Sequence, residues 1–119
     1  MVKKILICDD DEGIVDVAGI VLRDAGYDVT TITTSEKIFS VVDKLQPDMI
    51  LLDLWMPNIS GEEITLHLKN QDRTKHIPIV IVSASRKTEH IALKVGADDF
   101  MCKPFDIEQL EEIVRKYTA

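Results

Sequence analysis

Short apolar runs alternate with longer stretches of helical periodicity along the chain. Several of the short runs are rich in valine and isoleucine and have the length and composition of β-strands. Between them, apolar residues recur every three to four positions, as in a helix that buries one face. We predict strands over residues 5–8, 29–32, 49–52, 77–82 and 98–102, and helices over residues 12–25, 35–45 and 61–70, with a fourth ending at 96 and a fifth starting at 106.

Local signals mark where several of these helices begin and end. Gly26 suits the position just past the first helix, where the backbone commonly becomes left-handed. Ser35 can cap the start of the second helix, and Pro47 lies just beyond its end. Asp106 and Gln109 have the spacing of a capping box at the start of the last helix. The signals agree with a regular alternation of strands and helices.

The order of the elements predicts an α/β fold of five βα units. The run at residues 49–52 is continuously apolar, as expected of a parallel strand covered on both faces. Alternating units imply right-handed crossovers and a doubly wound, parallel five-stranded sheet between two helical layers. Five units are too few for an eight-stranded barrel. We expect one domain over residues 1–119, no output domain, and a stand-alone protein.

Composition and charge narrow the function. The 119 residues are 45% hydrophobic and 29% charged, with a formal net charge of −7. This acidic balance repels phosphate backbones and anionic lipids, so we expect no direct binding of nucleic acid or membrane. No apolar run approaches the roughly 20 residues of a membrane span or resembles a signal-peptide core, which predicts a cytoplasmic protein. Cys8 and Cys102 are expected to be buried free thiols.

Polar and charged residues follow four of the five predicted strands. The acidic residues 9–11 follow the first strand, Asp53 the third, Ser83 the fourth and Lys103 the fifth. In an open α/β sheet, ligands bind beyond the carboxyl ends of the strands, where the strand order reverses. We therefore expect these side chains to meet at one edge of the sheet.

These groups together suit phosphoryl transfer to an aspartate. Two carboxylates about 4 Å apart repel by about 4 kcal/mol at an effective dielectric near 20, which a cation would relieve. Oxygen ligands without nearby cysteine or histidine ligands favour Mg²⁺, or Mn²⁺, over zinc. Ser83 can donate a hydrogen bond to a phosphoryl oxygen, and Lys103 supplies a positive charge. Each feature alone is also typical of a solvated helix start, a cap or a turn; the prediction depends on their joint placement.

Along its whole length the sequence resembles the receiver domains of bacterial two-component response regulators. This resemblance implies the strand order 2-1-3-4-5 of flavodoxin-like sheets. The segments that carry it are Ile-Leu-Ile-Cys-Asp-Asp-Asp at 5–11, Leu-Leu-Asp-Leu-Trp-Met-Pro at 51–57 with Gly61, Ile-Val-Ile-Val-Ser-Ala at 79–84, and Gly-Ala-Asp-Asp-Phe-Met-Cys-Lys-Pro-Phe at 96–105.

The resemblance implies a phospho-acceptor and a metal site. Asp53 corresponds to the acceptor. Asp10 and Asp53 would ligate Mg²⁺ (or Mn²⁺) directly, Asp9 largely through water, and Trp55 through its backbone carbonyl. The domain would catalyse its own phosphorylation and dephosphorylation without being a turnover enzyme.

The resemblance also implies a switch. Ser83 and Lys103 would bind the phosphoryl oxygens, and the bond between Lys103 and Pro104 would be cis. Movement of Ser83 would make room for Phe100 and repack the face formed by the fourth helix, fifth strand and fifth helix. Serine and phenylalanine replace the threonine and tyrosine that are commoner at the Ser83 and Phe100 positions.

The implied partners are a sensor histidine kinase or phosphotransfer protein and an unidentified downstream protein. The domain would be monomeric when unphosphorylated, with dimerisation on phosphorylation left open.

Three alternatives are weighed against this interpretation. A haloacid-dehalogenase-type phosphatase also has an Asp-x-Asp core, as at residues 9–11, but Gly13 departs from its motif and the chain is short for that fold. A flavodoxin-like carrier needs a phosphate-binding loop after the first strand, where this chain is acidic. A binding module that works without phosphorylation would not require the complete set of acidic, hydroxyl and amino groups.

Overall fold

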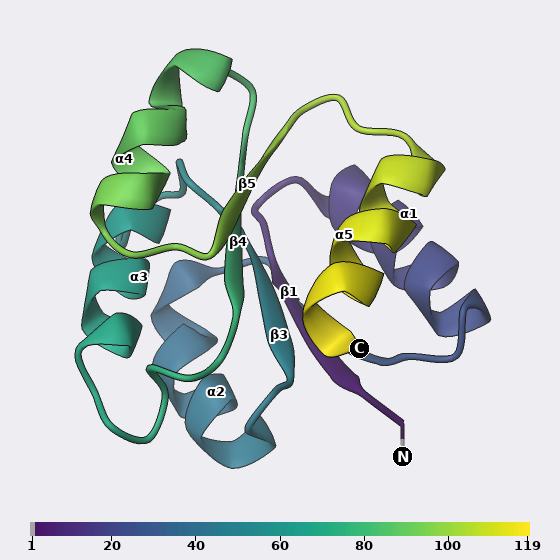
Figure 1. Ribbon diagram of the computed structural model, residues 1–119, viewed down its shortest axis with the longest axis horizontal. Helices are drawn as coiled ribbons and strands as arrows, with labels where there is room; N and C mark the ends of the chain where they lie inside the picture. The colour runs from purple at the N-terminus through teal and green to yellow at the C-terminus, as the bar shows by residue number, and fades with distance from the viewer. Residues whose placement is uncertain (1) are drawn as a thin grey trace.

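The sheet is fully parallel, and its strands lie in the order β2-β1-β3-β4-β5. The computed structural model describes residues 2–119, and Figure 1 shows the sheet in the middle of the molecule, between the helices. The order confirms the predicted doubly wound topology. The strands are β1 (Lys4–Cys8), β2 (Asp28–Ile32), β3 (Met49–Asp53), β4 (Ile79–Ser83) and β5 (Asp99–Cys102).

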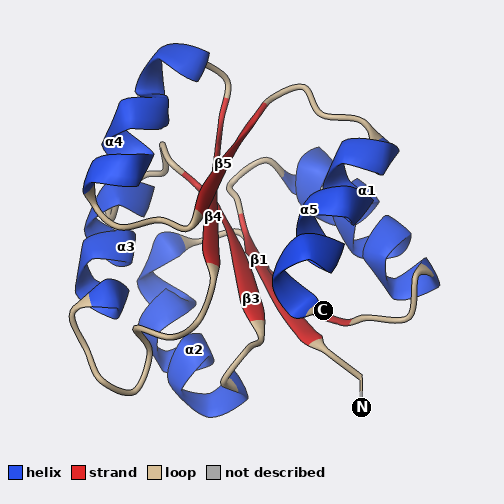
Figure 2. Ribbon diagram, in the orientation of Figure 1, coloured by secondary structure: helices blue, strands red, loops and turns tan. Residues whose placement is uncertain are grey.

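The helices form two layers, one on each face of this sheet. Helices α1 and α5 cover one face, and α2, α3 and α4 cover the other (Figures 1 and 2). Short 3₁₀ turns at Ser35–Lys37 and Arg86–Thr88 precede α2 and α4. The helices are α1 (Glu12–Asp24), α2 (Ile38–Leu45), α3 (Gly61–Lys69), α4 (Glu89–Lys94) and α5 (Ile107–Thr118).

Alternate residues of the central strands supply two separate cores. Ile5 and Ile7 of β1 pack with α1 and α5, whereas Leu6 and Cys8 face α2 and α3. Every residue of β3 and β4 is buried. Because both faces are covered, these strands are apolar at nearly every position up to their carboxyl ends. The polar residues at those ends therefore stand out.

The predicted helix boundaries agree with the structure at both ends of the chain. Gly26 follows α1 with a φ of 98°, a left-handed conformation that favours glycine. At the start of α5, the Asp106 side chain accepts from the Gln109 backbone N–H at 2.8 Å. The Gln109 side chain accepts from the Asp106 backbone N–H at 2.9 Å, which completes the capping box.

The prediction that Ser35 caps the second helix is wrong. Ser35 starts the 3₁₀ turn and is buried, with only 1% of its surface exposed. Its hydroxyl donates to the carbonyl of Pro57 at 2.7 Å and accepts from the backbone N–H of Ile59 at 3.1 Å. Ser35 therefore connects the loop after β2 to the loop after β3.

Two smaller predictions also need correction. The fourth strand begins at Ile79, after Pro78, and ends at Ser83 rather than covering residues 77–82. A proline cannot donate to the strand ladder, which explains this later start. Cys8 is buried as predicted, but Cys102 is partly exposed; both are free thiols. Within residues 2–119, no helix combines the length and apolar character needed to cross a membrane.

Candidate active site

Three carboxylates meet at the carboxyl ends of β1 and β3. These neighbouring strands bring Asp9 and Asp10 beside Asp53, and one oxygen from each of the three side chains lies within 4.8 Å of the others. Asp9 and Asp53 are buried, whereas Asp10 is exposed. The connections from β1 and β3 leave in opposite directions here, so the cluster lies at the point where the strand order reverses. An all-oxygen set with one open side fits a hard divalent cation such as Mg²⁺.

Lys103 reaches this cluster from the end of β5. Its Nζ lies 2.9 Å from Asp9 Oδ2 and 3.3 Å from Asp53 Oδ1. Only 18% of its side chain is exposed, so the surrounding water screens these contacts weakly. The peptide bond between Lys103 and Pro104 is cis. One ammonium group is thus shared between two buried carboxylates.

The site has unusual proton affinities because it is buried and strongly charged. Burial, together with the charge of Asp9, raises the pKa of Asp53 to about 6, although Lys103 opposes the shift. Burial alone would lower the pKa of Lys103, but the hydrogen bond to Asp9 and the charges of Asp53 and Asp9 raise it. Near neutral pH, Asp53 is therefore mainly an ionised carboxylate and Lys103 an ammonium ion.

The neighbouring Cys8 is not a competing nucleophile. Burial and then the charge of Asp9 raise the pKa of its thiol to about 12. Its Sγ lies 3.7 Å from Met56 Sδ, in apolar surroundings. Because thiolate is the reactive form, this thiol is inert near neutral pH.

Asp11 belongs to the acidic run but has a structural role. Its side chain accepts from the Ile14 backbone N–H at 3.2 Å and so caps α1. Its own backbone N–H donates to Asp9 Oδ1 at 2.9 Å, which holds the Asp9 carboxylate in place. The structure thus assigns the third acidic residue, which was not among the expected metal ligands and had no predicted role, to support of the first.

The loop after Asp53 turns sharply beneath Gly61. The Gly61 backbone N–H donates to the Leu54 carbonyl at 2.9 Å, which closes the loop. Trp55 lies within it, and 57% of this residue is exposed, so its indole extends into solvent while its backbone belongs to the closed turn. Gly61 was expected only as the start of the third helix and as part of the family resemblance, and this close approach was not predicted.

We expect Gly61→Ala to lower the free energy of unfolding by about 2 kcal/mol or more. An added Cβ would overlap the carbonyl oxygen of Asp53 and lie 2.9 Å from the Cα of Leu54. Both are backbone atoms, which cannot rotate away as a side chain can. Urea denaturation measures the change.

Gly13→Ala provides a matched control for this substitution. Its Cβ would meet only a side-chain oxygen of Asp11, at 3.3 Å, and alanine favours the helix that Gly13 occupies. This variant should change stability by less than about 1 kcal/mol. Equal effects of the two substitutions would contradict the close approach at Gly61.

Ser83 ends β4, and Phe100 lies on the neighbouring strand β5. Ser83 follows Val82, the residue of β4 that pairs with Asp53, and only 1% of its surface is exposed. Its carbonyl accepts from the Lys103 backbone N–H at 2.8 Å. Phe100 is also buried and belongs to the core beneath α3 and α4. Phe100 is therefore already directed inward in this structure.

The fold and this site define a class of protein, and comparison with known proteins agrees. The chain belongs to the response regulator receiver domain family, whose model matches residues 5–115. It is therefore a receiver domain of two-component systems, in which phosphoryl acceptance on an aspartate is the standard role. Receiver domains bind Mg²⁺ in their active site and interact with histidine kinases and downstream effectors.

Individual members of this family are similar to the chain in sequence or in structure. It is 38% identical over 114 residues to the DNA-binding dual master transcriptional regulator RpaA of Synechocystis sp., covering 94% of this chain and 47% of RpaA. The chemotaxis response regulator CheY4 of Vibrio cholerae superposes with a TM-score of 0.92 at 27% identity, covering 98% of this chain and 99% of that one.

A further solved structure shares the fold. The receiver domain of sensor histidine kinase PA1611 from Pseudomonas aeruginosa PAO1 superposes with a TM-score of 0.90 at 24% identity, covering 99% of this chain and 98% of that one. In that protein, a magnesium ion is coordinated in the active site cleft. The present chain spans about half the length of the curated relatives it matches.

Family membership sets aside the phosphatase and flavodoxin alternatives. The alternative of a binding module that works without phosphorylation is a different matter, because such a module could belong to the same family. Whether the site accepts a phosphoryl group distinguishes such a binding module from a receiver domain that is switched by phosphorylation.

Proposed function

We propose that Asp53 accepts a phosphoryl group from a histidine kinase or phosphotransfer protein. A carboxylate oxygen of Asp53 attacks phosphorus while the bond from phosphorus to the donor breaks, and the donor leaves with that bond's electron pair. The observation that carries the proposal is the buried Asp53 carboxylate, with acidic neighbours on one side and Lys103 on the other.

Asp10 and Asp53 would hold Mg²⁺ directly, with Asp9 acting largely through water and Trp55 through its backbone carbonyl. The donor set supports this assignment, since the three carboxylates converge and Asp10 is open to solvent. When bound, the cation neutralises negative charge at the reacting centre. Lys103 is already directed at Asp53 and would bind a phosphoryl oxygen after transfer.

Ser83 and Phe100 would transmit phosphorylation to the surface formed by α4, β5 and α5. Movement of the Ser83 hydroxyl toward a phosphoryl oxygen would let the buried Phe100 repack against α4. A phosphoryl group need favour one conformation by only a few kcal/mol to change which state dominates. His90 and Lys94 of α4 and Lys87 of the preceding 3₁₀ turn are exposed, and they would present this surface to a downstream protein in the cytoplasm.

An apolar groove that Lys103 helps to line supports a protein donor. The groove has a volume of about 640 Å³ and lies between α1 and the start of α5, next to Lys103. Val17 and Ile107 line it and are more than half exposed, at 59% and 55%. A small phosphodonor has no need of such a surface, whereas a protein whose phosphohistidine approaches Asp53 could bury it.

We expect the domain, residues 1–119, to be monomeric before phosphorylation.

The proposal predicts a single covalent adduct. With Mg²⁺ and acetyl phosphate, intact mass should show one phosphoryl group per chain, and peptide mapping should place it on Asp53. EDTA should abolish the adduct. Trp55 is the only tryptophan and lies two residues past Asp53, so its fluorescence should report binding of Mg²⁺ and of beryllofluoride, a phosphoryl mimic.

Asp53→Asn serves as the control for this experiment, because it removes the nucleophile and keeps the side-chain shape. An adduct of equal yield on the variant would place the acceptor elsewhere. Absence of any adduct on the wild-type protein, with no fluorescence response to the metal or the mimic, would favour the binding module that works without phosphorylation.

A further inference from the structure

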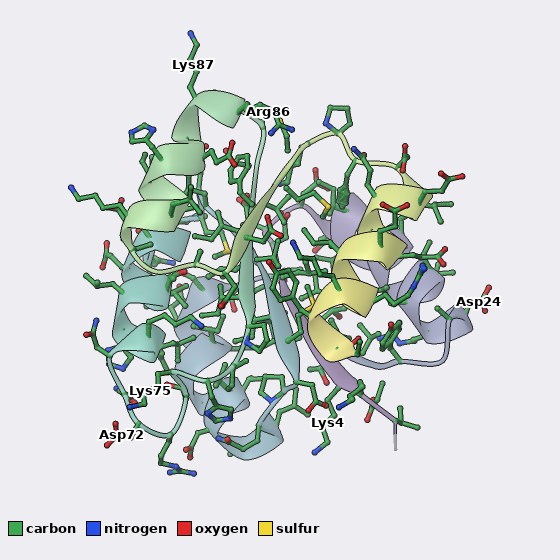
Figure 3. All side chains as sticks on the ribbon, in the orientation of Figure 1. Lys4, Asp24, Asp72, Lys75, Arg86 and Lys87 are labelled. Carbon is green, nitrogen blue, oxygen red and sulfur yellow. The ribbon has the colours of Figure 1, made fainter. Side chains whose placement is uncertain are left out.

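The Ser83 hydroxyl is in contact with the turn that leads into α4. Thr88 Oγ1 lies 2.9 Å from Ser83 Oγ and 2.6 Å from the carbonyl oxygen of Ser85. The Ser85 backbone N–H also donates to Ser83 Oγ, at 3.3 Å. Figure 3 shows the charged side chain of Lys87 projecting outward from this turn, and Arg86 beside it is also exposed. Thr88, in contrast, is partly buried and turned toward the site.

Counting protons fixes the direction of these hydrogen bonds. Thr88 has one hydroxyl proton, and the Ser85 carbonyl, which can only accept, lies closest to it. Donation from a threonine hydroxyl to the carbonyl three residues earlier is a common helical contact. The proton between the two hydroxyls must then come from Ser83. Ser83 thus has its only proton committed to Thr88 in this state.

This commitment has a consequence for phosphoryl binding. Phosphoryl oxygens are acceptors, so Ser83 can bind one only by donating the proton that it now gives to Thr88. The two contacts exclude each other. Because Thr88 lies in the turn that begins the α4 segment, the exchange links the site to that helix.

We propose that Thr88 is a positioning residue. In the unphosphorylated protein it holds the Ser83 hydroxyl by a hydrogen bond, and phosphorylation breaks this bond so that Ser83 can bind a phosphoryl oxygen. The proposal rests on the proposed function of Asp53 and deepens it. Thr88 therefore biases the unphosphorylated state and sets part of the free-energy difference that the phosphoryl group must overcome.

Titration with beryllofluoride in the presence of Mg²⁺, followed by Trp55 fluorescence, tests the proposal. Thr88→Val keeps the branched shape but removes the acceptor for Ser83, so it should bind the mimic about fivefold more tightly, the value of one ordinary hydrogen bond. Thr88→Ser keeps a hydroxyl and should bind like the wild-type protein. Thr88→Ala removes the hydroxyl in a second way and replaces the valine variant if that variant folds poorly.

A double-mutant cycle separates this role from a general structural effect. In a Ser83→Ala background, Thr88→Val should leave the affinity for the mimic unchanged, because no Ser83 proton is left to release. The proposal would be overturned if Thr88→Val changed the affinity for the mimic by the same factor in the wild-type and Ser83→Ala backgrounds, or changed it in neither.

Unfolding in urea without Mg²⁺ tests the resting contact independently of phosphoryl chemistry. The effects of Ser83→Ala and Thr88→Val on the unfolding equilibrium constant should be non-additive by about fivefold. Additive effects would refute the Thr88 contact even if Asp53 is the acceptor. Conversely, a wild-type protein that ignores the mimic but shows this coupling would refute the proposed function and limit Thr88 to a structural role.

Discussion

Replacing Lys103 with methionine should destabilise the metal-free protein by about 3 kcal/mol near neutral pH. The substitution removes the ammonium group that lies between Asp9 and Asp53, at 2.9 and 3.3 Å from their oxygens. Two buried carboxylates would then face each other without compensation, whereas the methionine side chain fills a similar volume. Urea denaturation with and without Mg²⁺ measures the effect, and Mg²⁺ should recover much of the loss because it neutralises the same carboxylates.

Lys69→Met is the matched control. Lys69 is a second largely buried lysine, whose Nζ lies 2.7 Å from Asp98 Oδ2 and 2.8 Å from the carbonyl oxygen of Ile77, in the loop before β4. Its loss should also destabilise the protein, but Mg²⁺ should not restore stability, because within residues 2–119 the cluster of acidic side chains that could hold a metal ion lies at Asp9, Asp10 and Asp53. If Mg²⁺ rescued both variants equally, the shared ammonium at Asp53 would not be the cause.

Replacing Asp53 with asparagine should have the opposite effect on stability. The pKa of Asp53 is raised from 3.8 to about 6, so the folded state disfavours its charge. A carboxyl group with a raised folded-state pKa contributes stability that is fully present below its unfolded pKa and is lost as pH rises through the folded value. Near neutral pH, Asp53→Asn should therefore increase the free energy of unfolding of the metal-free protein by about 2–3 kcal/mol.

The pH dependence identifies the cause of this gain. The stability difference between variant and wild type should be small near pH 3.8, grow up to a pH of about 6, and stay constant above it. Mg²⁺ should reduce the difference, since it stabilises the wild-type carboxylate. Urea midpoints across this range provide the measurement. A difference that did not vary with pH would attribute the gain to packing rather than to charge.

The sequence predicted the part of the site that depends on strand ends. Parallel strands must place their carboxyl ends at one edge of the sheet. The alternation of apolar runs was therefore enough to predict that Asp9, Asp10, Asp53 and Lys103 lie close together. The structure confirms that these four side chains converge. The strand order and the five βα units follow from the same periodicity and the family resemblance.

The contacts between loops could not be predicted in this way. A serine before an apolar helical stripe signals a cap, yet the partners of Ser35 lie more than 20 residues later, in the loop after β3. The pairing of Ser83 with Thr88 depends likewise on how the turn before α4 folds back. Periodicity determines which face of an element is buried, but it does not determine how two irregular segments meet.

The anchored Ser35 hydroxyl has a consequence for cation affinity. It fastens the segment from Pro57 to Ile59 from one side, while the Gly61 amide fastens Leu54 from the other, so the backbone that includes the Trp55 carbonyl is fixed at both ends. Binding to a backbone that is already held in place costs less conformational entropy of the chain than binding that must order a mobile loop. The Mg²⁺ site would thus be preorganised. Little of the binding free energy would be lost in ordering the loop, so the affinity for Mg²⁺ would be higher.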